Sequence, residues 1–429
     1  MEVIKNPQPQ DWPILIERPG IAQDALTNVV TSILNHVKAE KDNALKAYTT
    51  QFEKATLDQF HTTESEVTNA ITLVPDNLKA AIQLAKANIT KFHAAQQLAE
   101  AAIETAPGVT CWRKSVPIEK VGLYIPGGSA PLFSTILMLG IPAKLAGCNE
   151  IILCTPPDSN GAINPVILYT ANLVGIEKIY KVGGAQAIAA MAYGTESIPQ
   201  VYKIFGPGNQ YVTKAKELVQ QTGVSIDMPA GPSEVLIIAD NTGNPEFIAA
   251  DLLSQAEHGA DSQVILLSND EPLIQETLAA IADQLKALPR AAIVKQALKN
   301  SKAILFNNME HCIRFSNDYA PEHLIIASEN AKAYTSKITN AGSVFLGNYS
   351  CESAGDYASG TNHTLPTNGF AKSYSGVSLD SFVKKISFQE LRKEGIAAIG
   401  NAIEIMAEAE GLFAHKNAVS VRLKAIQNV

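Results

Sequence analysis

The sequence predicts an α/β fold made of two similar lobes, with helical segments at both ends of the chain. Three observations support this prediction. Short apolar stretches typical of strands alternate with helical stretches through the middle of the chain. Two of these strand–helix units resemble each other, and the segments that flank the middle carry apolar residues at helical spacing.

The segment from about residue 23 to residue 104 is predicted to be helical. The stretches ALTNVVTSILNHVKAEKDNALKAYTTQFEKA and NLKAAIQLAKANITKFHAAQQLAEAAIE place apolar residues at helical spacing beside Lys and Glu. Nothing in this segment indicates chemistry. We therefore interpret His36, His61 and His93 as packing or surface residues.

The middle of the chain predicts mostly parallel sheet. Strand-like stretches recur as KVGLYIPGG, NEIILCTPP, KIYKVGG, YKIFGPGN, SEVLIIAD and SQVILLSND. Their alternation with short helical stretches indicates βαβ units, whose crossovers make neighbouring strands parallel. Residues 124–156 and 237–269 share the order strand, loop, helix, glycine and strand, which predicts two related lobes.

The segment from about residue 380 onward is predicted to be helical throughout, after the Gly/Ser-rich stretch PTNGFAKSYSGVS. The expected parts are an N-terminal extension of residues 1–20, a first lobe of 21–123 plus 237–378, a second lobe of 124–236, and a C-terminal tail of 379–429.

Composition and charge exclude several classes of partner. The chain has 429 residues, of which 46% are hydrophobic, enough for sizeable cores. Lys and Arg number 34 against 42 Asp and Glu, without a long basic run, so we expect neither nucleic acid nor an anionic membrane as partner. No export signal or membrane span of roughly 18 apolar residues is visible, which predicts a cytoplasmic location. Five cysteines without a CxxC pair predict reduced thiols.

The stretch LLSQAEHGADSQ raises the possibility of a metal site. Pro245 lies early in the predicted helix and Gly259 follows its end, so Gln255 and His258 share its final turn. On local grounds this is either an ordinary polar helix end or half of a metal site.

Three further stretches carry residues suited to chemistry. In YAPEHLII, Glu322 and His323 precede a strand, and a histidine can accept a proton near neutral pH, although the pair also suits a plain loop. In SAGDYASGTNHTLPT, Asp356 and His363 lie among small residues that let the backbone bend around a ligand. In AEGLFAHKNAV, Glu410 and His415 are five residues apart, so they share a site only if the helix ends near Gly411; a solvated helix end is the alternative.

Two glycine turns, in VGGAQAIAAMAYG and FGPGNQYVTKAKE, each follow a strand and open a helix, where free N–H groups favour phosphate. Neither matches G-x-G-x-x-G, so a tight βα turn remains the alternative.

The candidate ligands form a chemically sensible set. Together, two imidazoles, a carboxylate and an amide oxygen suit zinc or another divalent first-row metal. Such a site, with one formal anion, can take further donors from a substrate that carries an amine and an imidazole. The set consists of Gln255, His258, Asp356 and His415.

Taken in order, several motifs across nearly the whole chain resemble the histidinol dehydrogenase family: YIPGGSAPLFSTILM, GGAQAIAAMAYGTESIP, KIFGPGN, DMPAGPSEVLIIAD, DLLSQAEHG, PEHLII, SAGDYASGTNH and AHKNAV. The resemblance implies a zinc-dependent enzyme that oxidises L-histidinol to L-histidine through the aldehyde in two NAD+-linked steps. It also implies two incomplete Rossmann-like lobes with helical extensions, in an intertwined homodimer with one Zn2+ per subunit.

The resemblance assigns roles to single residues. The zinc ligands would be Gln255, His258, Asp356 and His415, and these four would also contact the substrate together with Ser233, His323, His363 and Glu410. His415 and Glu410 would serve the partner's site. The NAD site, in the second lobe, would include Tyr124, Gln186 and Asn209.

The resemblance also makes Glu322 and His323 the proton-transfer pair. His323 would be the general base, and Glu322 would activate the water that the aldehyde must gain. A covalent route through Cys148 or Cys154 is the mechanistic alternative, and we favour packing roles for both thiols. Cys351 and Glu352 are expected to lie away from the chemistry.

Rivals from other classes are a two-lobed solute-binding protein, which would normally carry an export signal, and a zinc hydrolase or aldolase, which would produce no NADH.

Overall fold

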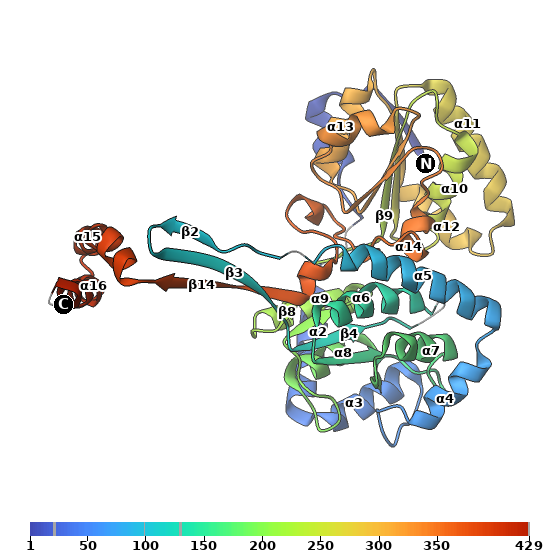
Figure 1. Ribbon diagram of the computed structural model, residues 1–429. Helices are drawn as coiled ribbons and strands as arrows, with labels where there is room; N and C mark the ends of the chain where they lie inside the picture. The colour runs from blue at the N-terminus through green and yellow to red at the C-terminus, as the bar shows by residue number, and fades with distance from the viewer. Residues whose placement is uncertain (20–22, 98, 128–130, 428–429) are drawn as a thin grey trace.

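The computed structural model describes residues 1–19, 23–97, 99–127 and 131–427. Two α/β lobes lie one above the other, and a narrow arm projects from between them (Figure 1). The predicted α/β class is confirmed, since each lobe is built on a parallel sheet with helices against it. Among the described residues, no helix is both long enough and apolar enough to span a bilayer.

One lobe contains a six-stranded sheet in which every neighbouring pair is parallel. The strands, in spatial order, are β1 (Glu2–Lys5), β11 (Lys302–Leu305), β10 (Gln263–Ser268), β9 (Glu234–Ala239), β12 (His323–Ala327) and β13 (Ser343–Leu346). The helices of this lobe are α1 (Trp12–Leu15), α10 (Pro245–Ala256), α11 (Glu271–Gln284), α12 (Ala291–Ala297), α13 (Met309–Tyr319) and α14 (Glu352–Tyr357). Separate apolar clusters cover its two faces, as the continuous apolar runs of the central strands require.

The other lobe contains a five-stranded parallel sheet. Its spatial order is β6 (Lys178–Lys181), β5 (Glu150–Thr155), β4 (Lys120–Tyr124), β7 (Lys203–Phe205) and β8 (Ser225–Ile226). The crossover helices are α6 (Phe133–Ala146), α7 (Pro165–Val174), α8 (Gly184–Tyr193) and α9 (Gln210–Gln220).

The N-terminal helices pack on this five-stranded lobe. They are α2 (Gln23–Glu40), α3 (Asp42–Tyr48), α4 (Glu64–Leu73) and α5 (Asp76–Ala94), with α2 against α8 and α9, and α5 against α6. The expectation that residues 21–123 belong with 237–378 is therefore wrong for these helices. Residues 2–5 also form an edge strand of the six-stranded sheet rather than a bare extension. Helical spacing shows that a helix has an apolar face, but not which sheet that face covers.

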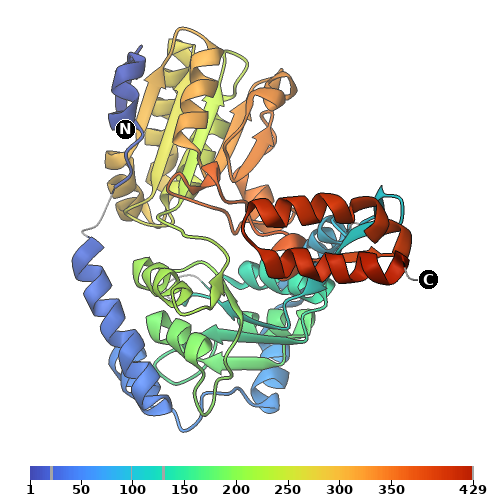
Figure 2. The same ribbon diagram turned by 90° about the vertical axis from the view of Figure 1, so that its left-hand side faces the viewer.

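The arm is a three-stranded antiparallel sheet that ends in two helices (Figures 1 and 2). It comprises β2 (Ile103–Ala106), β3 (Val109–Pro117) and β14 (Val383–Leu391), followed by α15 (Lys393–Ala409) and α16 (Phe413–Gln427). The prediction of continuous helix from residue 380 is thus wrong for 383–391, which pair with 109–117 along their full length. Long-range pairing overrides local preference in this segment.

Short turns complete the description. The 3₁₀ turns are η1 (Pro9–Asp11), η3 (Leu285–Ala287), η4 (Leu298–Asn300), η5 (Ala331–Lys337), η6 (Phe370–Lys372) and η7 (Leu379–Phe382), and η2 (Thr49–Glu53) is a π turn.

Candidate functional site

The candidate metal ligands gather where α10 ends. Asn244 caps the helix by accepting hydrogen bonds from the N–H groups of Glu246 and Phe247, and Pro245 is its first residue. Gln255, in the last turn, is buried, whereas His258, just beyond the helix, is exposed in the single chain. The end of α10 therefore presents one buried amide and one accessible imidazole.

Three side chains form a cluster of metal-binding type. Ligand atoms of His258, Glu352 and Asp356 all lie within 4.8 Å of one another. The Gln255 amide lies between Glu352 and Glu322, with its nitrogen 3.3 Å from Oε2 of Glu322. With the amide turned over, the nitrogen donates to Glu352 and the oxygen accepts from the Glu234 N–H at 3.0 Å. The structure thus brings together three of the four predicted ligands and adds Glu352.

The expectation that Glu352 lies away from the chemistry is wrong, because its carboxylate belongs to the cluster. Glu352 is the first residue of α14, and Asp356 follows one turn later on the same face of that helix. Helix α14 packs closely against Phe345 of β13, because a Cβ added at Gly355 would clash with the Phe345 ring. The sequence signal that could have identified Glu352 is its spacing, since Glu352 and Asp356 are four residues apart at the start of a helix.

The electrostatics of the cluster favour a cation. Burial raises the pKa of Glu352 well above its ordinary value; the charge of His323 opposes this shift, and the neighbouring carboxylates add to it. Burial would also raise the pKa of Asp356, but the nearby His323 lowers it on balance. Within the described part of the chain, Oε2 of Glu352 and Oδ1 of Asp356 are buried without a hydrogen-bond donor. Unpartnered buried acceptors beside an imidazole and an amide fit a divalent metal such as zinc.

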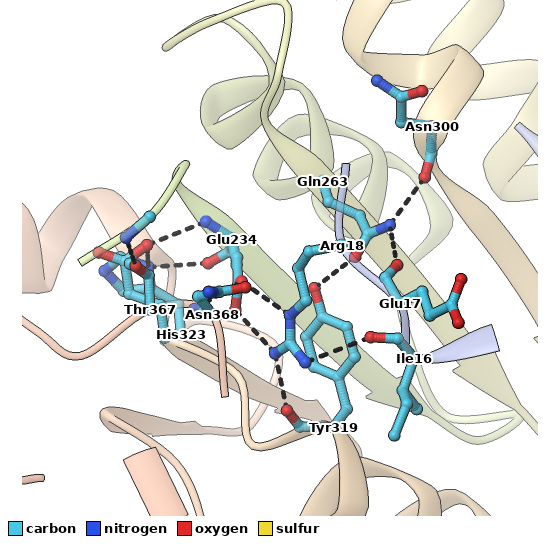
Figure 3. Close-up of polar contacts among 12 residues, drawn as sticks. Ile16, Glu17, Arg18, Glu234, Gln263, Asn300, Tyr319, His323, Thr367 and Asn368 are labelled. Atoms are coloured by element: carbon cyan, nitrogen blue, oxygen red, sulfur yellow. Dashed lines mark hydrogen bonds and ion pairs between the residues drawn. The ribbon is translucent and has the colours of Figure 1, made fainter. Parts of the chain in front are cut away.

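The candidate catalytic pair lies at the amino-terminal end of β12. Oε2 of Glu322 accepts a hydrogen bond from the Glu234 N–H at 2.9 Å, and Nδ1 of His323 lies 3.1 Å from the Glu234 carbonyl oxygen. Nε2 of His323 faces Oδ1 of Asp356 at 3.5 Å. The pair therefore adjoins the metal-binding cluster. Figure 3 shows the contact between His323 and Glu234.

Opposing forces set the protonation of this pair. Burial raises the pKa of Glu322 to about 7, although the charge of His323 acts against this shift. Burial alone would lower the pKa of His323, but the carboxylates of Glu322, Glu352 and Asp356 outweigh it and raise the pKa to about 10. A dication bound among these carboxylates would reduce that effect and bring His323 toward neutrality.

Two further predicted residues lie near the cluster. His363 connects the lobes: its Nε2 lies 3.0 Å from the hydroxyl of Thr135 on α6, and its Nδ1 lies 2.9 Å from the Asp356 carbonyl oxygen. Ser233 directly precedes Glu234 at the start of β9.

The single chain does not bring Glu410 and His415 to the cluster. Glu410 follows α15 and His415 lies on α16, and both are exposed. In Figure 1 these helices end the arm, well apart from α10 and α14.

The predicted nucleotide residues gather at the carboxyl end of the five-stranded sheet. Tyr124 ends β4, and its hydroxyl accepts a hydrogen bond from the Gly184 N–H at 3.0 Å. Gln186 lies in the same first turn of α8, and Asn209 caps α9 by accepting from the N–H groups of Tyr211 and Val212. Asn209 therefore has a structural role that its motif did not indicate.

A pocket of about 650 Å³ opens beside this end of the sheet, between η2, α4 and α7. Glu53 lines it, and Oε1 of Glu53 lies 3.5 Å from the amide nitrogen of Gln186. Burial raises the pKa of Glu53 to about 7. Sequence reasoning missed Glu53, because it belongs to a turn far from the glycine motifs.

Both thiols of the alternative covalent route are buried. Burial raises the pKa of Cys148 to about 11 and that of Cys154 still further. Neither thiol is a ready nucleophile, since nucleophilic attack requires the thiolate.

Comparisons with known proteins find relatives that match this chain over nearly its whole length. Residues 16–423 match the family model described as histidinol dehydrogenase. The chain is 57% identical over 427 residues to histidinol dehydrogenase of Bacteroides thetaiotaomicron, with 100% of both chains covered. It is 50% identical over 422 residues to histidinol dehydrogenase of Salmonella typhimurium, covering 98% of this chain and 96% of that one. The crystal structure of histidinol dehydrogenase from Elizabethkingia anophelis matches with a TM-score of 0.98 and 63% identity, covering 100% of this chain and 99% of that one.

Proposed function

The chain belongs to the histidinol dehydrogenase family, and on this premise we propose that it oxidises L-histidinol to L-histidine, the final step of histidine biosynthesis, using two NAD+. The observation that carries the proposal is the buried Glu322–His323 pair beside the cluster of His258, Glu352 and Asp356. A proton acceptor next to a set of metal ligands suits oxidation of a substrate that brings its own nitrogen donors.

The metal-binding cluster would hold and orient the substrate. Gln255, His258 and Asp356 would bind one Zn2+ per subunit, and the bound dication would favour the charged form of buried Glu352 beside them. Bound zinc would serve as a template that takes the amine and imidazole of histidinol. Ser233 and His363 border the cluster and would complete the substrate site.

Glu322 and His323 would move the protons. With Nδ1 of His323 donating to the Glu234 carbonyl, the neutral ring keeps Nε2 as an acceptor for the substrate hydroxyl proton. Glu322, with a pKa of about 7, can take a proton near neutral pH from the water that adds to the aldehyde. His323 would then act again on the hydrate.

The five-stranded lobe would bind NAD+, which accepts the hydride in each step. Tyr124 and Gln186 lie at one strand–helix turn, and Asn209 lies at the next. The N-termini of α8 and α9 carry partial positive charge, which suits the pyrophosphate.

A second copy of the chain would complete each site. His258 is exposed in the single chain, as are Glu410 and His415 on the arm. The arm and its helices also expose apolar side chains, a feature of protein interfaces: Ile386, Phe388, Leu391, Ile405, Met406 and Phe413. This supports a homodimer in which Glu410 and His415 serve the partner's site.

The decisive test is the yield of NADH from histidinol with zinc-loaded protein. We expect two NADH per histidinol consumed, and loss of turnover after a chelator removes the metal. A zinc hydrolase or aldolase would release no NADH, so consumption of histidinol without NADH would contradict the proposal. The cytoplasmic location and the absence of nucleic-acid and membrane partners stay predictions from charge and sequence.

A further inference from the structure

Arg18 lies directly behind the catalytic pair, in an ion pair with Glu234 (Figure 3). Nε of Arg18 lies 2.9 Å from Oε1 of Glu234, and Nη2 lies 3.1 Å from Oε2. The side chains of Arg18 and Glu234 are only 12% and 1% exposed. A buried, two-point contact of this kind is the most directional form of an arginine–carboxylate pair.

The main chain of Glu234 contacts both members of the catalytic pair. Its N–H donates to Oε2 of Glu322, and its carbonyl oxygen faces Nδ1 of His323. The Glu234 carboxylate is also fixed by the N–H of Asn368, which donates to Oε1 at 2.8 Å. A shift of Glu234 would therefore move the hydrogen-bond partners of Glu322 and His323 together.

Arg18 also contacts Tyr319, in the segment that leads into the catalytic pair. Nη2 donates to the Tyr319 carbonyl oxygen at 2.7 Å, and the guanidinium lies 3.6 Å from the centre of the Tyr319 ring. Tyr319 ends α13, and Ala320 follows it with a φ of 55° before the turn that leads into Glu322. One side chain thus joins the start of β9 to the turn before β12.

We propose that Arg18 is a positioning residue for the reaction, which fixes Glu234 and Tyr319 and thereby holds Glu322 and His323 in the orientation for proton transfer. This inference rests on the proposed roles of Glu322 and His323. Arg18 itself contacts neither the metal-binding cluster nor the nucleotide residues through any described hydrogen bond. Because small misplacements of catalytic groups cost about 100-fold in rate, the effect should fall on kcat and not on KM.

A purely structural role for Arg18 is the rival interpretation. Arg18 belongs to the N-terminal segment, which is also anchored by Trp12 packed against Phe306 and Phe315 at ring-centre distances of 5.6 and 5.5 Å. If Arg18 only anchored this segment, loosening the segment elsewhere would have the same effect. Trp12→Phe is therefore the matched control.

The test compares Arg18→Gln, Arg18→Lys and Trp12→Phe with the wild type, each measured for zinc content, thermal stability, and kcat and KM on histidinol and histidinaldehyde. We expect Arg18→Gln to keep its zinc and nearly its KM while kcat falls about 100-fold. Arg18→Lys should retain intermediate activity, because an ammonium pairs with one carboxylate oxygen and not with two. Trp12→Phe should lower the melting temperature with kcat unchanged.

Arg18→Gln with normal kcat, or an equal loss of kcat in Trp12→Phe, would overturn the inference. If Arg18→Gln does not fold, Arg18→Lys carries the same comparison. A wild type that yields no NADH from histidinol would instead contradict the proposed function itself.

A double-mutant cycle tests the route through Glu234. If Arg18 acts through that carboxylate, adding Glu234→Gln to Arg18→Gln should change kcat little beyond the larger single loss. Losses that multiply would show that the two residues act independently and would contradict the proposed route.

Discussion

At the residue scale, Glu322 and His323 are neighbours in the chain that face different charges. Burial dominates at Glu322 and raises its pKa to about 7, whereas surrounding carboxylates dominate at His323 and raise its pKa to about 10. In the proposed reaction, only the second oxidation needs an activated water. The two residues should therefore differ in the step that depends on them.

His323→Asn should suppress oxidation of both histidinol and histidinaldehyde by about 100-fold or more, because each step needs its proton transfer. Glu322→Gln should slow aldehyde oxidation more than alcohol oxidation. Steady-state kinetics on each substrate separate the two steps. Equal losses in both steps for Glu322→Gln would contradict the division of roles.

Glu352→Gln should weaken zinc binding about 10-fold to 100-fold, because it removes a buried charge beside the proposed ligands. Competition with a metal indicator gives the affinity. Glu276→Gln, an exposed site on α11, is the matched control and should bind zinc normally. Unchanged affinity in Glu352→Gln would exclude a role for this carboxylate.

Glu53→Gln should alter the pH dependence of stability. The folded pKa of Glu53 is raised to about 7, so the folded protein retains the proton between pH 4.5 and 7, where the unfolded chain has lost it. Its contribution to stability is thus present at low pH and lost as pH rises through 7. Urea unfolding without nucleotide measures the free energy of unfolding of both proteins. Relative to the wild type, this free energy should rise for Glu53→Gln between pH 4.5 and pH 8. A difference between the two proteins that stays constant with pH would contradict the prediction.

Single residues were predictable where a motif carries them. Gln255, His258 and Asp356 lie in stretches whose composition already suggested a ligand site, and the structure brings them together. A role for Arg18, Glu53 and Glu352 was not predicted, because it depends on contacts between distant segments, such as that of Arg18 with Glu234. Local sequence does not report such contacts.

At the element scale, the turn after β7 lies against the end of β4. Gly206 has a φ of 132°, and a Cβ there would overlap the carbonyl oxygen of Tyr124. Two side chains also hold this turn in place. Lys216 donates a hydrogen bond to the Gly206 carbonyl oxygen, and Asp227 accepts one from the Gly206 N–H. This close contact holds the turn that leads to Asn209 against the end of β4.

Gly206→Ala should lower the free energy of unfolding by about 2 kcal/mol or more and weaken NAD+ binding, because the added methyl group must displace Tyr124. Gly223→Ala is the control, since Gly223 has a φ of 94° but open space around it. It should lose about 1 kcal/mol through backbone strain alone and bind NAD+ normally. Urea unfolding and calorimetric titration measure both effects.

Strand β14 shows where element prediction fails. Its sequence VKKISFQEL alternates Ile386 and Phe388 with polar residues, yet long helical stretches follow it and favour helix. Pairing with β3, whose residues lie far away in the chain, decides the outcome. The parallel sheets were predictable because each strand and its crossover helix are adjacent in sequence.

At the scale of the whole molecule, the two-lobe plan was predictable but the assignment of the N-terminal helices was not. The lobes follow from repeated local units, whereas the packing of α2 on α8 and α9 depends on which surface each apolar face meets. In the proposed function, a complete site needs two chains, because Glu410 and His415 would come from the partner.

Mixing two inactive variants tests that shared site. His415→Ala and His323→Asn homodimers should each be inactive, but refolding them together should restore about a quarter of the wild-type activity. The reason is that half of the random dimers would contain one intact site. Full activity of a monomer, or no recovery after exchange is verified, would contradict sharing.

The ends of the helices at which the two sets of residues lie have one more consequence. The metal-binding cluster lies at the carboxyl end of α10, where peptide dipoles leave partial negative charge. The predicted nucleotide residues lie at the amino ends of α8 and α9, where the same dipoles leave partial positive charge. The dipole of α10 therefore favours a cation in one lobe, and the dipoles of α8 and α9 favour a polyanion in the other.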